Sequence, residues 1–408
     1  DLLIVAPSCV PATELETSGA RLGPQDIRRA LRWRGVIGLG EVMNFPAVIA
    51  GDDHTLSKLE AAAGRIKDGH APRVTGKALN AYLCPLIGSD HETTQYQEGL
   101  EKLRRGMHLM IREGSAEKNL EELLPLVNDG NYHRCMLVVD DRNAKDIYHD
   151  GDVDAVVRKA IALGMDPVRA VQLATINPAR YFRLDGLGGI GPGYWANLLV
   201  LDDLKRFTIG AVYYRGRLVA KGGKPLFRAR VPLKPGMLRT VKVKPFTVAD
   251  LALKHPGDTF PVIEIIPGQI VTRWLDQRVA RRNGTVVPDV ERDLLKLVVV
   301  ERHKATGNIG VGDGGQHDLR VYCSRGYLLM AMVAGTMTVR THDGTVEQIG
   351  PLPEEERYPR FATAHNLVDV ILGRAQNGSP GEVGARTVEL LDAAYRSAVQ
   401  EGRPVTVL

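Results

Sequence analysis

The stretch Val36-Ile37-Gly38-Leu39-Gly40-Glu41-Val42-Met43-Asn44 decides the fold, because it is an apolar run that ends on a carboxylate. The same pattern recurs where apolar runs lead into Asp68-Gly69-His70-Ala71, Ser89-Asp90-His91-Glu92 and Val139-Asp140-Asp141-Arg142. A parallel α/β barrel collects its catalytic side chains at the carboxyl ends of its strands. Glutamate, histidine and aspartate together suit a hard or borderline divalent metal. The sequence therefore predicts a metal-dependent hydrolase.

Residues 1 to about 180 alternate short apolar runs with helix-like stretches, which is typical of a parallel sheet built from βαβ units. We expect six strands, at Leu2–Ala6, Val36–Leu39, Arg65–Asp68, Pro85–Ile87, His108–Ile111 and Cys135–Val139. Apolar periodicity predicts helices at Pro24–Arg34, Thr55–Gly64, Thr93–Arg105, Ala116–Leu126, Val153–Leu163 and Pro167–Thr175. A (β/α)8 barrel needs eight strands, so the predicted fold class is α/β, a metallohydrolase barrel that lacks its first two strands.

The sequence pattern changes twice after the predicted barrel. From about Leu187 a glycine-rich turn cluster leads into short, Pro-punctuated strands. From near Gly312, alternating strands at Leu319–Tyr322, Tyr327–Ala331 and Thr336–Arg340 lead into predicted helices at Phe361–Leu372 and Glu382–Glu401. We predict three domains: a partial hydrolase barrel over 1–182, a small β domain over 183–312, and a C-terminal α+β sheet segment over 313–408.

Composition narrows the classes of function. The 408 residues carry 53 Lys+Arg against 48 Asp+Glu, a formal net charge of +5 that is too small and too spread for a nucleic-acid surface, and aromatic residues are only 5%. No apolar stretch reaches the roughly 20 residues that cross a bilayer, and we see no signal peptide. Because the first residue is Asp, we expect the natural start upstream. Four widely separated cysteines fit a reducing cytoplasm. We expect a cytoplasmic protein with a small-molecule partner, no nucleic acid and no membrane; the sequence permits a homo-oligomer.

Each candidate site residue has an ordinary structural interpretation beside the functional one. Glu41 alone fits a surface turn; a dinucleotide loop is excluded because Met43 stands where the third glycine of GxGxxG belongs. A lone histidine is more often structural, but His70 and His91 end successive strands, which makes metal ligation about as plausible. Asp140 follows a run apolar enough to be buried, so we expect it in a site, where it could act as a general base.

The stretch Ile111-Arg112-Glu113-Gly114-Ser115 ends another predicted strand. Its polar groups either line the pocket or form a solvated turn. We assign Arg112 and Ser115, together with Glu92, to substrate binding.

These motifs, in this order, resemble the adenine deaminase family of the amidohydrolase superfamily. The resemblance runs from residue 1 to about Gly312. It also rests on Pro7–Thr13, Glu16–Ala20, Thr175–Arg180 and Val300–Asn308.

The resemblance implies a dinuclear metal centre, usually of manganese or iron. Glu41 would bridge the two metals, His70 and His91 would bind one of them, and Asp140 would bind the other and act as acid and base. A metal-bound hydroxide would attack C6 of adenine, and ammonia would leave to give hypoxanthine, a reaction of purine salvage.

Two departures from the family stand out. The family's first-strand His-x-His, which holds the second metal, is absent from the chain, in agreement with two missing strands. From about residue 318 the sequence resembles the C-terminal part of the glucose-fructose oxidoreductase/inositol dehydrogenase-like family, in Arg360–Asn366 and Gly381–Glu389. The nucleotide-binding half is not present, so we expect no NAD chemistry. Two hypotheses remain: an adenine deaminase, or a catalytically incomplete remnant or fusion without deaminase activity.

Overall fold

The computed structural model describes residues 2–12, 17–228, 236 and 240–315, and four strands between 318 and 349. The chain divides into two compact units. The first unit is Asp1–Thr240 with Ile266–Thr272, and the second is Val241–Ile265 with Arg273–Leu408. Across these described ranges, no helix is both long and apolar enough to cross a membrane.

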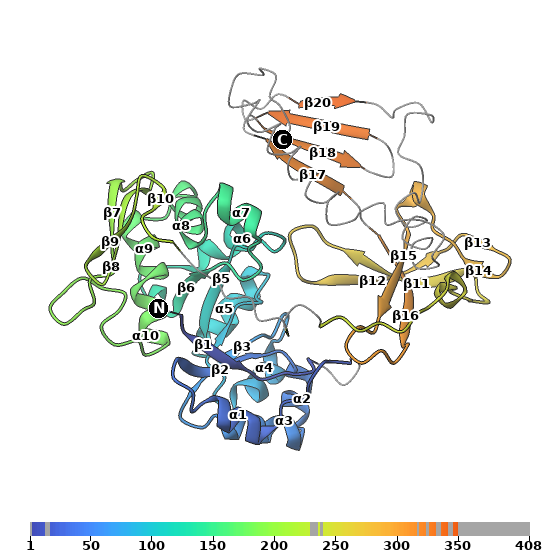
Figure 1. Cartoon of the computed structure of the whole chain (residues 1–408), viewed down its shortest axis with the longest axis horizontal. Helices are drawn as coiled ribbons and strands as arrows, with labels where there is room; N and C mark the ends of the chain where they lie inside the picture. The colour runs from blue at the N-terminus through green and yellow to red at the C-terminus, as the bar shows by residue number, and fades with distance from the viewer. Residues whose placement is uncertain are drawn as a thin grey trace. The chain divides into compact units, whose positions relative to one another are not determined.

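Within its described residues, the first unit contains six short parallel strands in chain order (Figure 1). They form two three-stranded sheets, β1-β2-β3 and β4-β5-β6, with bounds Ile4–Pro7, Val36–Val42, Ile66–Gly69, Ser89–Asp90, His108–Arg112 and Cys135–Val138. The two sheets are linked at Gly88, whose N–H donates to the Lys67 carbonyl (3.0 Å) and whose carbonyl accepts from the His108 N–H (2.8 Å). The parallel α/β arrangement predicted from the sequence is therefore confirmed.

One of the six predicted strands is wrong in position. Pro85–Ile87 is not a strand, and the strand β4 begins only at Ser89. Leu86 has a left-handed backbone (φ 62°) and is 78% exposed, so the chain turns outward there. The apolar residues 85–87 resemble a short strand in sequence. Ile87 is indeed buried, but none of the three residues belongs to the sheet.

Helices follow the strands of the first unit. Their bounds are α1 Pro24–Ala30, α2 Phe45–Ala50, α3 Asp53–Ala61, α4 Gly76–Leu83, α5 Tyr96–Arg104, α6 Leu120–Leu123, α7 Ala144–His149, α8 Val153–Ala162, α9 Pro167–Ala174 and α10 Ile176–Tyr181, with 3₁₀ turns η1 Leu124–Leu126 and η2 Tyr132–Arg134. The sequence analysis missed the short helix α2. It is defined at its ends, because the Asn44 side chain accepts from the Ala47 N–H (3.3 Å) and Gly51 is left-handed (φ 77°).

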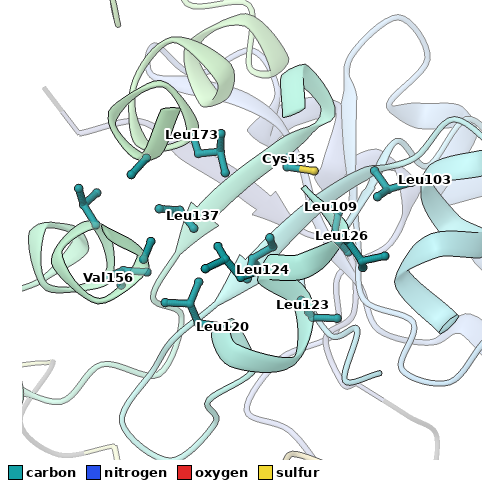
Figure 2. Close-up of a cluster of buried hydrophobic side chains, with 14 of the residues drawn as sticks. Leu103, Leu109, Leu120, Leu123, Leu124, Leu126, Cys135, Leu137, Val156 and Leu173 are labelled. Atoms are coloured by element: carbon teal, nitrogen blue, oxygen red, sulfur yellow. The ribbon is translucent and has the colours of Figure 1, made fainter. Parts of the chain in front are cut away.

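Two hydrophobic clusters hold these layers together. In Figure 2, Leu109 and Leu137 from strands β5 and β6 lie with Val156 and Leu173 from helices α8 and α9. The second cluster packs β2 against α1, α3 and α4 through Leu39, Ile27, Leu59, Leu79 and Tyr82. Each fully buried side chain of this kind stabilises the fold by about 1.5–3 kcal/mol. The two clusters therefore hold the strands in place against the helices, and so position the polar motifs at the strand ends.

An antiparallel sheet completes the first unit, in the order β10-β9-β8-β7. Its strands are β7 Leu198–Asp203, β8 Thr208–Tyr214, β9 Arg217–Lys221 and β10 Lys224–Pro225, which confirms the short strands predicted after about Leu187. Phe207, between β7 and β8, is buried in the first hydrophobic cluster and anchors this sheet.

The second unit is built from short strands. A four-stranded sheet has the order β12-β11-β16-β15, from β11 Thr259–Ile265, β12 Thr272–Arg278, β15 Leu295–Val300 and β16 Ile309–Gly315. Beside it in the chain are the hairpin β13 Arg281–Arg282 and β14 Thr285–Val286 and the 3₁₀ turns η4 Val248–Leu251 and η5 Val290–Arg292.

A second antiparallel sheet lies further along the chain, in the order β17-β18-β19-β20. Its strands are β17 Asp318–Cys323, β18 Gly326–Ala331, β19 Thr336–Thr341 and β20 Val346–Ile349, so the three strands predicted for this segment are confirmed. The helices predicted at 361–372 and 382–401 lie outside the described residues. The three predicted domains stay a prediction.

Candidate metal centre

Glu41, His70 and His91 meet at the ends of three neighbouring strands, β2, β3 and β4. His91 Nε2 lies 3.6 Å from Glu41 Oε1, and His70 Nδ1 lies 3.9 Å from Glu41 Oε2. The two imidazole rings are nearly perpendicular, with centroids 5.3 Å apart. One ligand atom from each residue lies within 4.8 Å of the others, so the three can face a single ion.

Glu92 adds a second carboxylate to this group. Its Oε1 lies 3.7 Å from His70 Nδ1 and 3.5 Å from His91 Nε2. Such separations are long for hydrogen bonds but shorter than twice a metal–ligand distance of about 2.1 Å. They are what two ligands of a common ion would show.

Two buried atoms at this site also lack a partner. His70 Nδ1 and Glu92 Oε2 are buried and have no hydrogen-bond partner among the described residues. Buried polar atoms are nearly always satisfied, so an unpaired nitrogen and an unpaired carboxylate oxygen at one place need an explanation. A divalent cation fits this donor set of imidazole nitrogens and carboxylate oxygens.

The protonation of His70 suits a ligand. Burial, followed by the nearby charge of His91, lowers the pKa of His70 to about 4. A histidine must be neutral to bind a metal, and His70 is neutral throughout the physiological range. Burial alone would lower the pKa of His91, but Asp68 and Asp90 outweigh it and raise that pKa. The surrounding carboxylates thus favour a positive charge at this position.

Arg112 connects this group to Asp140. Its guanidinium, fully buried on β5, contacts Glu92 and lies 3.1 Å from Asp140 Oδ2 and 2.8 Å from Glu117 Oε2. Ligand atoms of His91, Glu92 and Asp140 also lie within 4.8 Å of one another. Burial raises the pKa of Glu92 to about 7, although the nearby positive charges of Arg112 and His91 lower it.

The backbone is strained at both predicted catalytic carboxylates. Glu41 has φ of 37° and Asp140 has φ of 55°, in the left-handed region that side chains avoid. Such a conformation costs about 1–3 kcal/mol and is typical of functional sites. Glu41 lies next to the last residue of strand β2, and Asp140 lies two residues beyond the end of strand β6.

Six of the seven predicted site residues therefore lie together: Glu41, His70, His91, Glu92, Arg112 and Asp140. Ser115 lies in a neighbouring network instead. Its hydroxyl donates to Asp146 Oδ2 (2.5 Å) and accepts from the Asn143 N–H (2.9 Å), and its N–H donates to Asp141 Oδ1 (3.1 Å). Ser115 thus holds the start of α7 beside the residue that follows Asp140.

The sequence analysis missed a series of hydrogen-bonded side chains that leads away from Arg112. Asn119, fully buried, accepts from Arg112 Nη2 (3.3 Å) and donates through Nδ2 to Gln269 Oε1 (3.0 Å). The neighbouring Gly268 carbonyl accepts from the Lys118 N–H (3.0 Å). Gln269 belongs to the segment Ile266–Thr272 of the first unit, 150 residues further along the chain than Asn119. No local pattern marks a partner at such a separation.

A cavity of about 490 Å³ lies near the ends of β1 and β2. Its lining includes Ser8, Cys9, Val42, Asn44 and Lys58, but none of the candidate ligands. We therefore place the candidate metal centre at the ligand group and assign no role to the cavity.

Comparison with known proteins gives the class. Residues 1–219 match the amidohydrolase family, and the chain belongs to that family. Residues 269–313 match the adenine deaminase C-terminal domain.

Curated relatives of high similarity are adenine deaminases. The chain is 54% identical over 312 residues to an adenine deaminase of Dehalococcoides mccartyi, which covers 76% of this chain and 55% of that protein. It is 46% identical over 316 residues to an adenine deaminase of Oleidesulfovibrio alaskensis, with 76% and 54% covered. The chain thus spans about half the length of these curated relatives.

Solved structures give a more distant likeness. A β-aspartyl dipeptidase from Fervidobacterium islandicum AW-1 shares 17% identity and a TM-score of 0.38, over 50% of this chain and 63% of that one.

Proposed function

We propose that this chain has the activity of an adenine deaminase, the hydrolysis of adenine by water to hypoxanthine and ammonia. The observation that carries the proposal is the meeting of Glu41, His70 and His91, with Asp140 linked to them through Arg112. The 54% identity to a curated adenine deaminase supports the choice of substrate.

The metal would be Mn²⁺ or Fe²⁺ in a dinuclear centre. Glu41 would bridge the two ions, His70 and His91 would hold one, and Asp140 would hold the other. Divalent ions in such a centre lower the pKa of water and so supply a nucleophile at neutral pH.

Asp140 would move the protons of the reaction. Arg112 donates to Oδ2 of Asp140 (3.1 Å), which orients the carboxylate without burying it. The carboxylate would accept a proton from the attacking water and return it to the amino nitrogen on C6, so that ammonia leaves. One water enters and one ammonia leaves, so the proton inventory balances.

Glu92, Arg112 and Ser115 would bind the purine. The Glu92 carboxyl group, buried beside His70 and His91, would contact a ring nitrogen of the purine. Arg112 would hold that carboxyl group in place, and Ser115 would contribute through the loop that it shares with Asp141.

The fold and setting of this enzyme are also proposals. The six parallel strands would be the last six of an eight-stranded barrel that lacks its first two strands, followed by the small β domain (183–312) and the oxidoreductase-like segment (313–408). The chain order of β1 to β6 supports this reading. Free cysteines at Cys9, Cys84 and Cys135 support a cytoplasmic setting. We propose a purine as the small-molecule partner.

One experiment tests the activity directly. The chain is loaded with Mn²⁺ under anaerobic conditions, and ammonia release from adenine is measured while bound metal is counted. Turnover with about two ions per chain supports the proposal. No turnover, with one ion or none bound, would identify the chain as a catalytically incomplete remnant or fusion.

A further inference from the structure

We propose that Lys102 is a positioning residue for the metal centre. It fixes the spacing of His70 and His91 through the backbone segments next to them. The inference rests on the proposed function insofar as those two histidines bind the metal. Lys102 contacts neither imidazole; it acts through the chain segments that carry them.

Lys102 is the centre of a buried ionic cluster. It lies on α5 with no exposed surface, beside Asp90 (0% exposed) and Glu98 (4% exposed). Its Nζ lies 2.9 Å from Asp90 Oδ2, 2.6 Å from Glu98 Oε1 and 3.1 Å from Thr93 Oγ1. A buried ammonium is costly unless it is fully paired, so the cluster restrains every group that it contacts.

The first restraint joins the residue after His70 to the residue before His91. The Ala71 carbonyl accepts from Lys102 Nζ (2.8 Å), and the Ala71 N–H donates to Asp90 Oδ1 (2.7 Å). Both polar groups of Ala71 are thus held by the Lys102–Asp90 pair. Because Asp90 precedes His91 directly, the distance between the two histidine backbones follows from these bonds.

The second restraint lies three residues beyond each histidine. Glu98 Oε1 accepts from the Arg73 N–H (2.8 Å), and Glu98 Oε2 accepts from the Thr94 N–H (3.3 Å). Lys102 holds the Glu98 carboxylate one helical turn further along α5. Both loops that follow the histidines are therefore tied to one helix, at two points each.

Simple stabilisation does not explain this arrangement. An ionic cluster in a protein interior is often no better for stability than packed apolar side chains. Here its hydrogen bonds go to backbone groups that flank both ligands, so its removal changes ligand geometry. Loss of the cation alone would favour Mn²⁺ binding, because a like charge disappears. Weaker Mn²⁺ binding in a variant would therefore report lost geometry rather than lost charge.

The test compares Lys102→Met with Leu103→Ala in the full chain. Leu103 is the next residue of α5 and is buried in the first hydrophobic cluster, away from the histidine loops. Mn²⁺ affinity is measured by calorimetry at a temperature where both variants are folded, and the EPR line shape of bound Mn²⁺ is recorded. We expect Lys102→Met to bind Mn²⁺ about 10- to 100-fold more weakly with an altered spectrum. Leu103→Ala should lose thermal stability but keep affinity and spectrum.

If Lys102→Met does not fold, the Mn²⁺ affinity of Thr93→Val tests the proposal instead. This substitution removes the hydroxyl that donates to Asp90 Oδ2 (2.6 Å) and keeps the side-chain volume. A few-fold weaker affinity supports the proposal, and unchanged affinity in the folded variants overturns it. A wild-type chain that binds no Mn²⁺ would overturn both this inference and the proposed function. One that binds Mn²⁺ but releases no ammonia from adenine would overturn only the proposed activity.

Discussion

Asp140 combines an exposed carboxylate, a left-handed backbone and a bond to Arg112. Replacement by Asn keeps the shape and removes the proton acceptor, so we expect Asp140→Asn to lower deaminase turnover by about 10²- to 10⁴-fold. The melting temperature should hardly change, because the side chain is not in the core. Ammonia release and thermal unfolding measure the two effects.

The matched control is Asp129→Asn, at a carboxylate 98% exposed and paired with Arg169. It should leave turnover unchanged. Wild-type rates in Asp140→Asn would refute the assignment of Asp140.

Glu92 predicts a pH dependence of stability in the metal-free chain. Its pKa is 4.5 in an unfolded chain and about 7 in the fold, raised by burial. Between these values the folded state binds more protons than the unfolded state, so stability from this group falls as pH rises. Glu92→Gln cannot ionise, and it should gain stability relative to wild type by up to about 3 kcal/mol from pH 4.5 to pH 7.

Urea denaturation of both proteins at several pH values measures this difference. His70, whose lowered pKa acts in the opposite direction below pH 6.5, is common to both and cancels. A constant difference between the two proteins across the range would show that Glu92 ionises normally.

At the scale of elements, the contact between β3 and β4 leaves no room for a side chain. A Cβ on Gly69 would lie 2.1 Å from the Ser89 carbonyl oxygen and 2.9 Å from Ile87 Cγ2. Gly69→Ala must push apart the strands that carry His70 and His91. We expect a loss of about 1–3 kcal/mol in stability together with weaker Mn²⁺ binding.

Chemical denaturation and metal titration check both expectations for Gly69→Ala. Gly312→Ala is the control, since no atom lies within 4 Å of its added Cβ. If Gly69→Ala matches Gly312→Ala in both measurements, the close approach of β3 and β4 is not needed.

Elements also show what the sequence could predict. Long apolar runs such as Cys135–Val139 revealed their strands because they are buried on both faces. The strand β4 has only two residues, so its position depends on partners rather than on its own pattern. Thr93–Gln95 were predicted as helix, but the Thr93 hydroxyl bonds to Asp90 and α5 begins at Tyr96.

The sequence could predict those residues of the candidate site that are ionisable and lie at the end of a strand. An apolar run precedes each of Glu41, His70, His91 and Asp140. Because the carboxyl ends of parallel strands lie at the same edge of a sheet, residues at these ends come close together. Lys102 had one overlooked signal: with Glu98, Gly99 and Leu103 it occupies the buried face of α5, where a charged residue needs a partner. Its partners come from other loops and could not be read from the helix.

At the scale of the whole molecule, the segment Ile266–Thr272 supports the site of the first unit from far along the chain. Gln269→Leu would remove the acceptor of Asn119 Nδ2 and leave a buried donor unpaired. The expected cost is about 1–3 kcal/mol of stability. Deaminase kcat/KM should also fall, because Asn119 holds Arg112.

Denaturation and ammonia release measure these effects, with Gln277→Leu on β12 as the control. Equal behaviour of the two variants would show that the segment does not support the site.

The left-handed backbones of Glu41 and Asp140 have a consequence for engineering. Glycine adopts such angles freely, so a library selected only for heat resistance should enrich glycine at both positions. The survivors would melt later and would have lost the carboxylates that make the site. Selection for this protein must therefore test ammonia release as well as thermal stability, because selection for stability alone would favour variants without the two carboxylates.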